Sequence, residues 1–342
     1  MSHLGSPKGQ VDLKLSLNVV AKRLSSLLKK EVDFASDCIN EATTKLCLEL
    51  KEGKIILLEN LRFHAAEENP DLDLTFASSL AKLGECYVDD AFACAHRNHS
   101  SITKICSYFK QSALAGLLMQ KEVNALSTLL LNPKKPFFAI LGGFKVSSKI
   151  GVIRSLLNKV DGLFIGGGMA TVFLKASGFN VGSSLVDLPC LKEALEVMAL
   201  CKQRNIPLYL PTDLLISKSV SNPIDVKSVD VKSNVPEGFY IVDAGKDTVY
   251  KWNEKLKMAA TVFWNGPIGI FEIEAFSNGT FDLAKAIASL SCLTVAGGGD
   301  SVSAINKIHI SNKFSHISTG GGAALEFIEF GTLPGLESLT NA

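Results

Sequence analysis

The sequence has no excess of charge of either sign. Lysine and arginine together number 35 and aspartate and glutamate 34, which gives a formal net charge of +1. A chain this close to neutrality has no overall field that would attract nucleic acid or an anionic membrane surface. We therefore expect neither as a partner, and any phosphate group must be recognised by charge that is placed locally.

Disulfide and metal-binding patterns are missing as well. The eight cysteines form no CxxC pair and show no zinc-ligand spacing, and most of them lie inside apolar runs. They are typical of reduced core residues in a cytoplasmic protein. His96 and His99 stand three residues apart, but neither an HExxH motif nor a matching third ligand accompanies them. The pattern does not favour a histidine metal site.

The sequence also has no obvious membrane or targeting segment. The longest uncharged stretch of interest, residues 162–174, is too short and too rich in glycine to span a bilayer. The first twelve residues, MSHLGSPKGQVD, lack the apolar segment of a signal peptide. We therefore expect a soluble, cytoplasmic protein.

Two familiar nucleotide-binding fingerprints are missing too. Neither GxGxxG nor GxxxxGK[ST] occurs anywhere in the chain. The lack of the first disfavours a nicotinamide-dependent dehydrogenase, and the lack of the second excludes a P-loop. A phosphate ligand would need a different arrangement of glycine turns.

What is present predicts an α/β protein with two domains. The 342 residues exceed what one hydrophobic core usually serves. In the first half, helical periodicity over residues 18–28 and 75–84 alternates with strand-like runs over 54–61 and 86–92, which is typical of parallel β/α units. A long helix is predicted over 113–131, before the breaker NPKKP, and we place the domain boundary in or just before it.

The second half repeats one plan: an apolar strand, a glycine-rich turn and the start of a helix. The carboxyl ends of parallel strands meet at one edge, where open α/β folds bind ligands. A single turn of this kind is most simply a tight connection. The whole set favours an extended anion, because exposed N–H groups and helix N-termini suit phosphate. The segments are FFAILGGFKVSSKIGVI (137–153), GLFIGGGMATVFLKASG (162–178), TVFWNGPIGIFEIEAF (261–276), LTVAGGGDSVSAI (293–305) and HISTGGGAALEF (316–327).

Charged side chains follow several of these turns. Lys145 and Lys149 come after the first glycine pair, where lysines oppose the helix dipole and suit a polyphosphate better than helix stability. A solvated surface pair is the alternative. Glu272 could accept hydrogen bonds from ribose hydroxyls or only interact with a helix N-terminus. Asp300 could cap a helix or provide the first carboxylate for Mg²⁺.

Two arginines stand at the ends of strand-like runs in the first half. Arg62 lies in LENLRFH and Arg97 in DDAFACAHRNHSS, each with histidine nearby. Arginine can hold a phosphorylated or carboxylated metabolite through paired hydrogen bonds. For either arginine alone, a surface salt bridge is the alternative.

Taken in order, eight segments resemble the motifs of the phosphoglycerate kinase family over nearly the whole chain. The resemblance implies reversible phosphoryl transfer between 1,3-bisphosphoglycerate and ADP, giving 3-phosphoglycerate and ATP in glycolysis. It also implies Mg²⁺ as the cofactor of the nucleotide, and a monomer. The segments are SHLGSPKG, LLENLRFH, DDAFACAHR, LGGFKVSSKIGVI, IGGGMA, WNGPIGIFE, GGGDSVSAI and SHISTGGGAALEF.

The same resemblance implies a fold of two doubly wound parallel-sheet (Rossmann-like) α/β domains joined by a long helix. Residues 1–118 would form the phosphoglycerate domain and 119–318 the nucleotide domain. Residues 319–342 would form a C-terminal tail that returns to the first domain. Hinge closure of the two domains would exclude water from the reacting groups.

Site residues carry over from the family position by position. Lys145, with the turn that contains Gly320 and Gly321, would stabilise the migrating phosphoryl group, which needs positive charge and N–H donors rather than a nucleophile. Asp300 would bind Mg²⁺. The phosphoglycerate site would contain His3, Leu4, Gly5, Ser6, Arg62 and Arg97. The nucleotide site would contain Gly143, Lys149, Gly167, Asn265, Glu272, Gly298, Gly299, Asp300 and Ser301.

The chain departs from the family pattern at its beginning. In the family, several dozen residues that include strands and substrate contacts precede the SHLG loop, and the usual arginine of that loop is Ser6 here. We therefore expect a first domain that lacks its N-terminal strands. The alternative to an active kinase is a truncated, catalytically weak remnant that still binds nucleotide.

Overall fold

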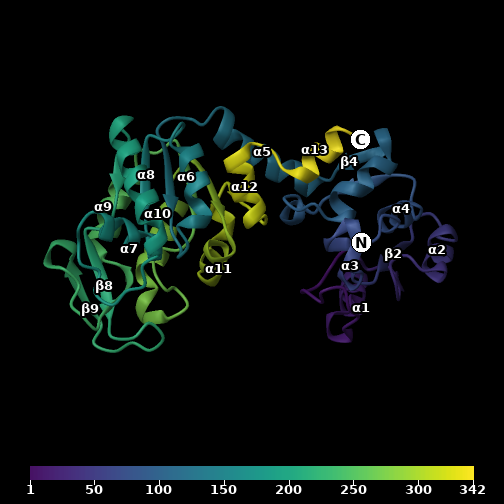
Figure 1. The fold of residues 1–342 in the computed structure, drawn as a ribbon, viewed down its shortest axis with the longest axis horizontal. Coiled ribbons are helices and arrows are strands. Elements are labelled where there is room, and N and C mark those ends of the chain that lie inside the picture. Colours follow the sequence, from purple (N-terminus) through teal and green to yellow (C-terminus); the bar gives the residue numbers. More distant parts are fainter. The chain divides into compact units, whose positions relative to one another are not determined.

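The structure, a computed structural model, describes residues 1–342 and divides into two compact units. Unit 1 comprises Met1–Gln120 and Thr332–Ala342, and unit 2 comprises Lys121–Gly331. Helix α5 (Leu117–Leu131) begins in unit 1 and continues into unit 2 (Figure 1). Residues 319–331, which the family pattern assigns to the tail, lie in unit 2 because α12 (Gly322–Phe330) packs against α6 (Ile150–Leu156).

Unit 1 has short strands that pair in parallel only two at a time, β1 with β2 and β3 with β4. Its core includes the fully buried side chains of Phe76 and Cys38. The C-terminal segment belongs to this unit, and the Gly335 N–H donates to the Ala95 carbonyl at 2.8 Å. The strands are β1 (Val32–Ala35), β2 (Ile55–Leu58), β3 (Tyr87–Asp89) and β4 (Ala113–Ala115), and the helices are α1 (Asn18–Leu28), α2 (Glu41–Leu48), α3 (Ala65–Glu68), α4 (Phe76–Ala81) and α13 (Pro334–Thr340).

The alternation expected in this half is confirmed, with one correction. The helix predicted over 18–28 is α1, and β2 and β3 lie within the runs predicted as strands. The helix predicted over 113–131 starts only at Leu117. Its first three residues form β4 instead, because they pair with β3 in register from Tyr87↔Ala113 onward.

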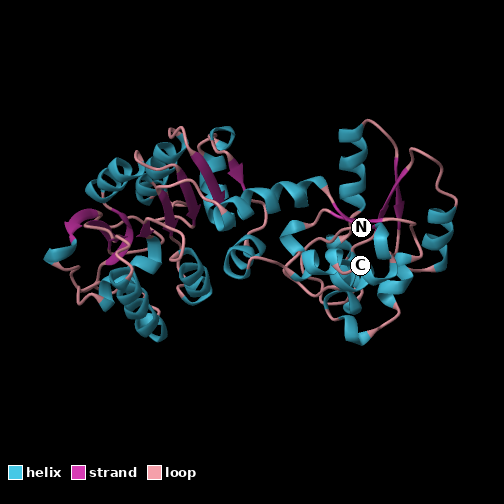
Figure 2. Cartoon of the chain, turned by 90° about the horizontal axis from the view of Figure 1, so that it is seen from above, coloured by secondary structure: helices cyan, strands magenta, loops and turns pink.

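Unit 2 is built on a six-stranded parallel sheet in the order β13-β12-β11-β5-β6-β7. This is the doubly wound order, in which the chain crosses outward from the centre in both directions. Every residue of β5, β6 and β11 is buried, as expected for a parallel sheet that is covered on both faces. Figure 2 shows these strands as arrows. They are β5 (Phe137–Leu141), β6 (Gly162–Ile165), β7 (Leu208–Tyr209), β11 (Thr261–Asn265), β12 (Leu293–Gly297) and β13 (His316–Ile317).

Helices cover both faces of this sheet. Side chains of α9, α10 and α11, among them Trp252, Leu283 and Ile305, pack with Trp264 of β11 on one face. The crossovers from β5 to β6 and β7 run across the sheet in the opposite direction to those from β11 to β12 and β13. Because such crossovers are right-handed, α6 lies on the other face, where it packs against α8 and α12. These helices are α7 (Gly167–Ala176), α8 (Leu191–Gln203), α9 (Lys246–Leu256), α10 (Asn278–Ala288) and α11 (Gly299–Lys307).

A second, antiparallel sheet lies in unit 2 between β7 and β11 in the sequence. Its order is β10-β8-β9, with β8 (Asp213–Ser217), β9 (Lys227–Asp230) and β10 (Tyr240–Ala244). It packs on a small apolar cluster of its own around Ile216 and Val235.

The eight cysteines form no disulfide. Cys38, Cys106, Cys190 and Cys201 are buried, whereas Cys86 is exposed, so the expectation of core residues holds for part of the set. Measured against the length and hydropathy that crossing a bilayer requires, none of the helices qualifies as a membrane span.

Candidate active site

The centre of the six-stranded sheet is the point at which the chain reverses its direction of crossing. From β5 the chain proceeds through β6 to β7, and from β11 it proceeds through β12 to β13 on the other side. In open α/β sheets the crevice outside the carboxyl ends of such strands binds ligands. The turns after β5 and β11 are therefore positioned to form a site.

These two turns are joined by their backbones. The Gly142 N–H donates to the Asn265 carbonyl and the Gly143 N–H to the Pro267 carbonyl, both at 2.8 Å. Gly266 has φ +96°, and a Cβ added there would lie 2.4 Å from the carbonyl carbon of Gly142. The approach is so close that only glycine fits at this position.

Lys149 is tied to the same two turns. Its Nζ donates to the Gly142 carbonyl at 2.6 Å and to the Asn265 carbonyl at 3.3 Å, and the residue is 9% exposed. Burial lowers the pKa of this amine to about 8, although the nearby Asp300 carboxylate acts in the opposite direction. Lys145, by contrast, is exposed in the loop. One lysine is thus a fixed charge at the sheet edge, and the other is free to follow a ligand.

A cavity of about 350 Å³ opens at these turns, and we call it the polar cavity. It brings together most of the residues predicted for the nucleotide side, from strands β5, β11 and β12 and from the last glycine turn. Its lining comprises Gly143, Phe144, Lys145, Lys149, Asn265, Gly266, Gly298, Gly299, Asp300, Ser301, Gly321, Gly322 and Leu325.

Asn265 presents a free donor in the polar cavity. The residue is 2% exposed, and its Nδ2 has no hydrogen-bond partner within the protein. A Cβ added to Gly298 would lie 2.8 Å from this Nδ2, so the glycine leaves the amide uncovered. Ser301 is instead engaged by the protein, because its Oγ accepts from the Gly266 N–H at 2.6 Å. A buried donor without a partner is rare, and here a ligand oxygen can satisfy it.

Two helices start at the polar cavity without a side-chain cap. Gly298, with φ +90°, is the N-cap of α11, and Gly321, with φ +51°, is the N-cap of α12. The alternative in which Asp300 caps the helix is therefore wrong. Asp300 lies within the first turn of α11, and the N-cap residue of this helix is Gly298. The uncapped N–H groups suit an anion.

A buried network holds the turn before α12. Glu122 of α5 is fully buried, and its carboxylate accepts from the Thr319 N–H and hydroxyl, both at 2.7 Å. His316 Nε2 lies 2.8 Å from the other carboxylate oxygen. Burial would raise the pKa of Glu122, but these hydrogen bonds outweigh it and leave the pKa lowered. These contacts with Glu122 hold the turn that contains Gly320 and Gly321 in place.

A second cavity, of about 470 Å³, adjoins the first, and we call it the apolar chamber. It shares Gly143, Phe144 and Asp300 with the polar cavity. Gly167 and Glu272 line it, but Glu272 does not stand at a helix entry as expected, since α10 begins only at Asn278. Its apolar walls are Leu185, Val220, Tyr240, Ile241, Val242, Pro267, Ile268 and Ile270.

Sequence reasoning missed these walls. Leu185, Val220, Tyr240, Ile241 and Val242 come from β10 and from loops without a glycine motif, whereas Pro267, Ile268 and Ile270 lie in the glycine-turn segment 261–276 but were not predicted as site residues. An apolar residue in either kind of segment cannot be distinguished from core by its pattern. Asp243 at the end of β10 was also missed. It is 2% exposed, lines the chamber and accepts from the Gly279 N–H at 2.6 Å, and burial raises its pKa to about 8.

Unit 1 gathers positive charge around the N-terminal loop. Arg62 is 6% exposed, donates from its guanidinium to the Gly5 carbonyl at 2.9 Å and pairs through Nε with Glu68 at 3.2 Å. The Asn60 side-chain amide donates to the Leu4 carbonyl at 2.8 Å. Ser6 is exposed in the same loop. The hydrogen bond between Arg62 and Gly5 thus fixes both the guanidinium and the N-terminal loop.

Histidines complete this group. Burial first, and then the charges of Arg62 and Arg97, lower the pKa of His3, and the same causes lower that of His99 to about 4. We call His3, Arg62, Arg97 and His99 the basic cluster. His99 was seen in the sequence only as a rejected metal ligand. A bound anion would offset the effect of the two arginine charges on the histidines.

A family model and two similar relatives carry the same description. A family model described as phosphoglycerate kinase matches residues 1–330. A phosphoglycerate kinase of Moorella thermoacetica is 46% identical over 340 residues, which cover 99% of this chain and 85% of the relative. One of Chlorobium phaeobacteroides is 47% identical over 347 residues, covering 100% and 86%. The chain belongs to the phosphoglycerate kinase family.

Solved structures agree. The phosphoglycerate kinase of Coxiella burnetii superposes with a TM-score of 0.87 at 38% identity and covers 99% of this chain and 85% of its own. That of Pyrococcus horikoshii gives 0.82 at 31% identity, covering 95% and 82%. The expected two-domain α/β fold is confirmed.

The function expected from the sequence is confirmed by the same matches. The chain is a phosphotransferase that moves a phosphoryl group between 1,3-bisphosphoglycerate and ADP in glycolysis. The alternative of a catalytically weak remnant has no support in these comparisons, which align 99% or more of the chain with the curated relatives above.

Proposed function

We propose that unit 2 binds the nucleotide and unit 1 binds the phosphoglycerate. The observation that carries the proposal is the pair of adjoining cavities at the centre of the parallel sheet, one apolar and one lined by lysines and uncapped helix starts. An apolar chamber beside a phosphate-binding edge matches a nucleoside polyphosphate in both chemistry and order.

In this proposal each part of the nucleotide has its own partners. The base enters the apolar chamber and Glu272 accepts hydrogen bonds from the ribose hydroxyls. The phosphates lie in the polar cavity, where Lys149, the Asn265 amide and the N–H groups of Gly298, Gly299 and Ser301 provide positive charge and donors. Gly143 and Gly167 allow the ligand to approach the backbone closely.

The donor set also fits Mg²⁺. Asp300 is a single carboxylate at the junction of the two cavities, and Mg²⁺ in kinases is held by one or two carboxylates together with substrate phosphates. No cluster of three or more histidine, cysteine or acidic side chains offers an alternative metal site in residues 1–342. When bound, Mg²⁺ would neutralise charge on the phosphate oxygens.

The phosphoglycerate is proposed to bind at the N-terminal loop and the basic cluster, through His3, Leu4, Gly5, Ser6, Arg62 and Arg97. In transfer, a carboxylate oxygen of 3-phosphoglycerate forms a bond to the terminal phosphorus of ATP while the bond from that phosphorus to ADP breaks. Lys145 and the N–H groups at Gly320 and Gly321 then stabilise charge on the three equatorial oxygens. A monomer in the cytoplasm completes the proposal.

A coupled assay of ATP-dependent 1,3-bisphosphoglycerate formation tests these roles. We expect Lys145→Ala to lower kcat by about 100- to 1000-fold, the usual effect of one lost electrostatic donor. The Kd of MgADP should stay within a few-fold of wild type, because Lys145 is exposed in the loop. Lys246→Ala is the matched control, since Lys246 is also exposed, at the start of α9, but lies outside both cavities.

No turnover by the wild-type chain under any substrate and Mg²⁺ concentration would contradict the proposal as a whole. A Lys145→Ala enzyme with unchanged kcat would remove only the role of that lysine.

A further inference from the structure

Phe144 is a large apolar side chain in an unexpected place. It stands between Gly143 and Lys145 and is 51% exposed, although it lies directly beside two cavities that could shelter it. It is also the only aromatic residue in the lining of the polar cavity, and it lines the apolar chamber too. Its ring therefore stands at the junction between the proposed nucleoside and phosphate positions.

The local backbone holds this residue in place. Gly143 has φ +82°, and its carbonyl accepts from the Met169 N–H at 2.9 Å, which ties the loop to the start of α7. A Cβ added to Gly168 would lie 2.7 Å from the Phe144 ring and 3.1 Å from its Cα. The ring thus packs on one side against a glycine in the first turn of α7, and the rest of its surface stays open.

We infer that the Phe144 ring is an aromatic contact for the nucleoside part of the ligand. The inference rests on the proposed function of the two cavities. An aromatic ring that is already held in position gains contact area at little cost in conformational entropy when a base or ribose covers its open surface. Most side chains on the walls of the chamber are apolar, so stacking and apolar contact are the main interactions available to the nucleoside.

The effect of the ring is measured by direct titration calorimetry on the full chain. The ligands are MgADP, adenosine and inorganic tripolyphosphate, and the variants are Phe144→Ala and Phe144→Tyr. We expect Phe144→Ala to weaken MgADP and adenosine about tenfold each, the usual size of one lost aromatic stack. Tripolyphosphate, which has no nucleoside, should bind within about twofold of wild type, and Phe144→Tyr should retain the affinity for all three.

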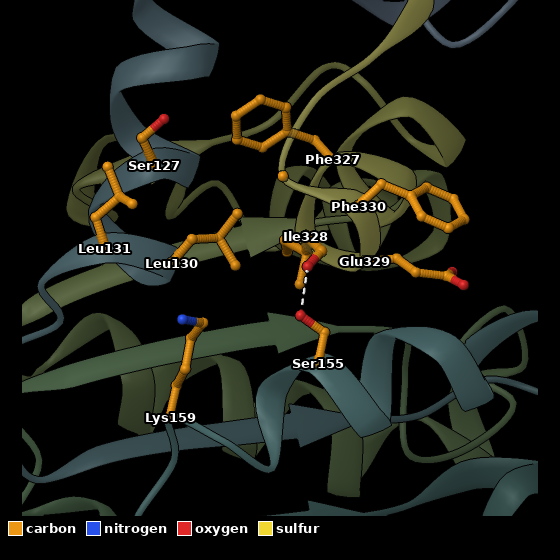
Figure 3. A pocket seen from close by; sticks show the side chains of 10 residues that line it. Ser127, Leu130, Leu131, Ser155, Lys159, Phe327, Ile328, Glu329 and Phe330 are labelled. Carbon is orange, nitrogen blue, oxygen red and sulfur yellow. Dashed lines mark hydrogen bonds between the residues drawn. The ribbon is translucent and has the colours of Figure 1, made fainter.

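Phe330→Ala is the matched control. Phe330 is 66% exposed and also lines a cavity, at the far end of α12 from the Gly321 turn. Figure 3 shows this third cavity, where the Ser155 hydroxyl donates to the Ile328 carbonyl at 2.7 Å. Loss of this exposed ring should leave all three affinities unchanged.

The titrations distinguish a failure of the inference from a failure of the proposed function. Equal affinity of wild type and Phe144→Ala for MgADP would overturn the inference and leave the proposed function intact. An equal loss for tripolyphosphate would also overturn it, because the ring would then act on the loop rather than on the nucleoside. Failure of the wild-type chain to bind MgADP would overturn both. Should Phe144→Ala not fold, Phe144→Leu replaces it, since leucine keeps the apolar bulk but loses the ring.

Discussion

The proposed nucleotide side in unit 2 and the basic cluster in unit 1 are built in different ways. In unit 2 the turns after β5 and β11 are joined backbone to backbone, and glycine is required where they meet. In unit 1 the strands pair only two at a time, and the site residues are held by side chains that bond to a loop, as Arg62 bonds to the Gly5 carbonyl. The first kind of site is sensitive to added volume, and the second to lost charge.

The largest effect is expected from added volume in unit 2. Gly266→Ala would place a Cβ 2.4 Å from two atoms of Gly142 and 2.8 Å from Lys149 Nζ, on top of the cost of its φ of +96°. We expect loss of detectable MgADP binding and a destabilisation of roughly 3 to 5 kcal/mol. Differential scanning calorimetry and titration measure the two effects.

Gly178→Ala is the control for backbone strain alone. Gly178 has φ +88°, but a Cβ there would meet nothing within 4 Å. It should cost only about 1 to 2 kcal/mol and leave MgADP binding unchanged. If both variants behave alike, the junction of the two turns has no special role.

Loss of charge in unit 1 should change the stability of the protein by different amounts at Arg62 and at Arg97. Arg62→Ala removes a nearly buried guanidinium and its bond to the loop, so we expect a loss of about 1.5 to 3 kcal/mol in stability. Arg97→Ala removes an exposed side chain and should change stability by no more than about 0.5 kcal/mol.

Both substitutions should reduce the thermal protection that 3-phosphoglycerate provides, but not the protection provided by MgADP. The measurement is the ligand-induced rise in Tm of each variant. Full protection of Arg97→Ala by 3-phosphoglycerate would make that arginine a surface residue without a role in the site.

A smaller effect is expected from pH. Burial lowers the pKa of Lys149 to about 8 in the free protein, and bound phosphates would raise it, so MgADP binding takes up a proton above that pH. Affinity should therefore fall as the pH rises from about 8 towards 10, by at most about tenfold per pH unit. Lys149→Ala should lack this decline. A decline of equal size in that variant would assign it to another group.

Much of the unit 2 site could be anticipated from the sequence, for a physical reason. Glycine turns after apolar strands are visible in the sequence, and parallel strands bring such turns to one edge, so Gly143, Lys149 and Asp300 come together without any knowledge of the loops.

Features that depend on distant partners were not predictable. Residues 113–115 continue a helical pattern and become β4 only because β3 offers them a pairing edge. Glu122 lies within a helix in the sequence, and its role appears only when His316 and Thr319 are brought to it. Tyr240 and Val220 look like ordinary core or loop residues until the chamber forms around them.

The separation of the two substrates between the two units is the central claim, and cross-titration tests it most directly. MgADP and 3-phosphoglycerate are each titrated into the wild type, Lys149→Ala and Arg97→Ala. Loss of a charge-assisted contact of about 1.5 to 3 kcal/mol should weaken MgADP by roughly 10- to 150-fold in Lys149→Ala, with 3-phosphoglycerate within twofold of wild type. Arg97→Ala should show the reverse pattern. Equal loss of both affinities in either variant would contradict the assignment of one substrate to each unit.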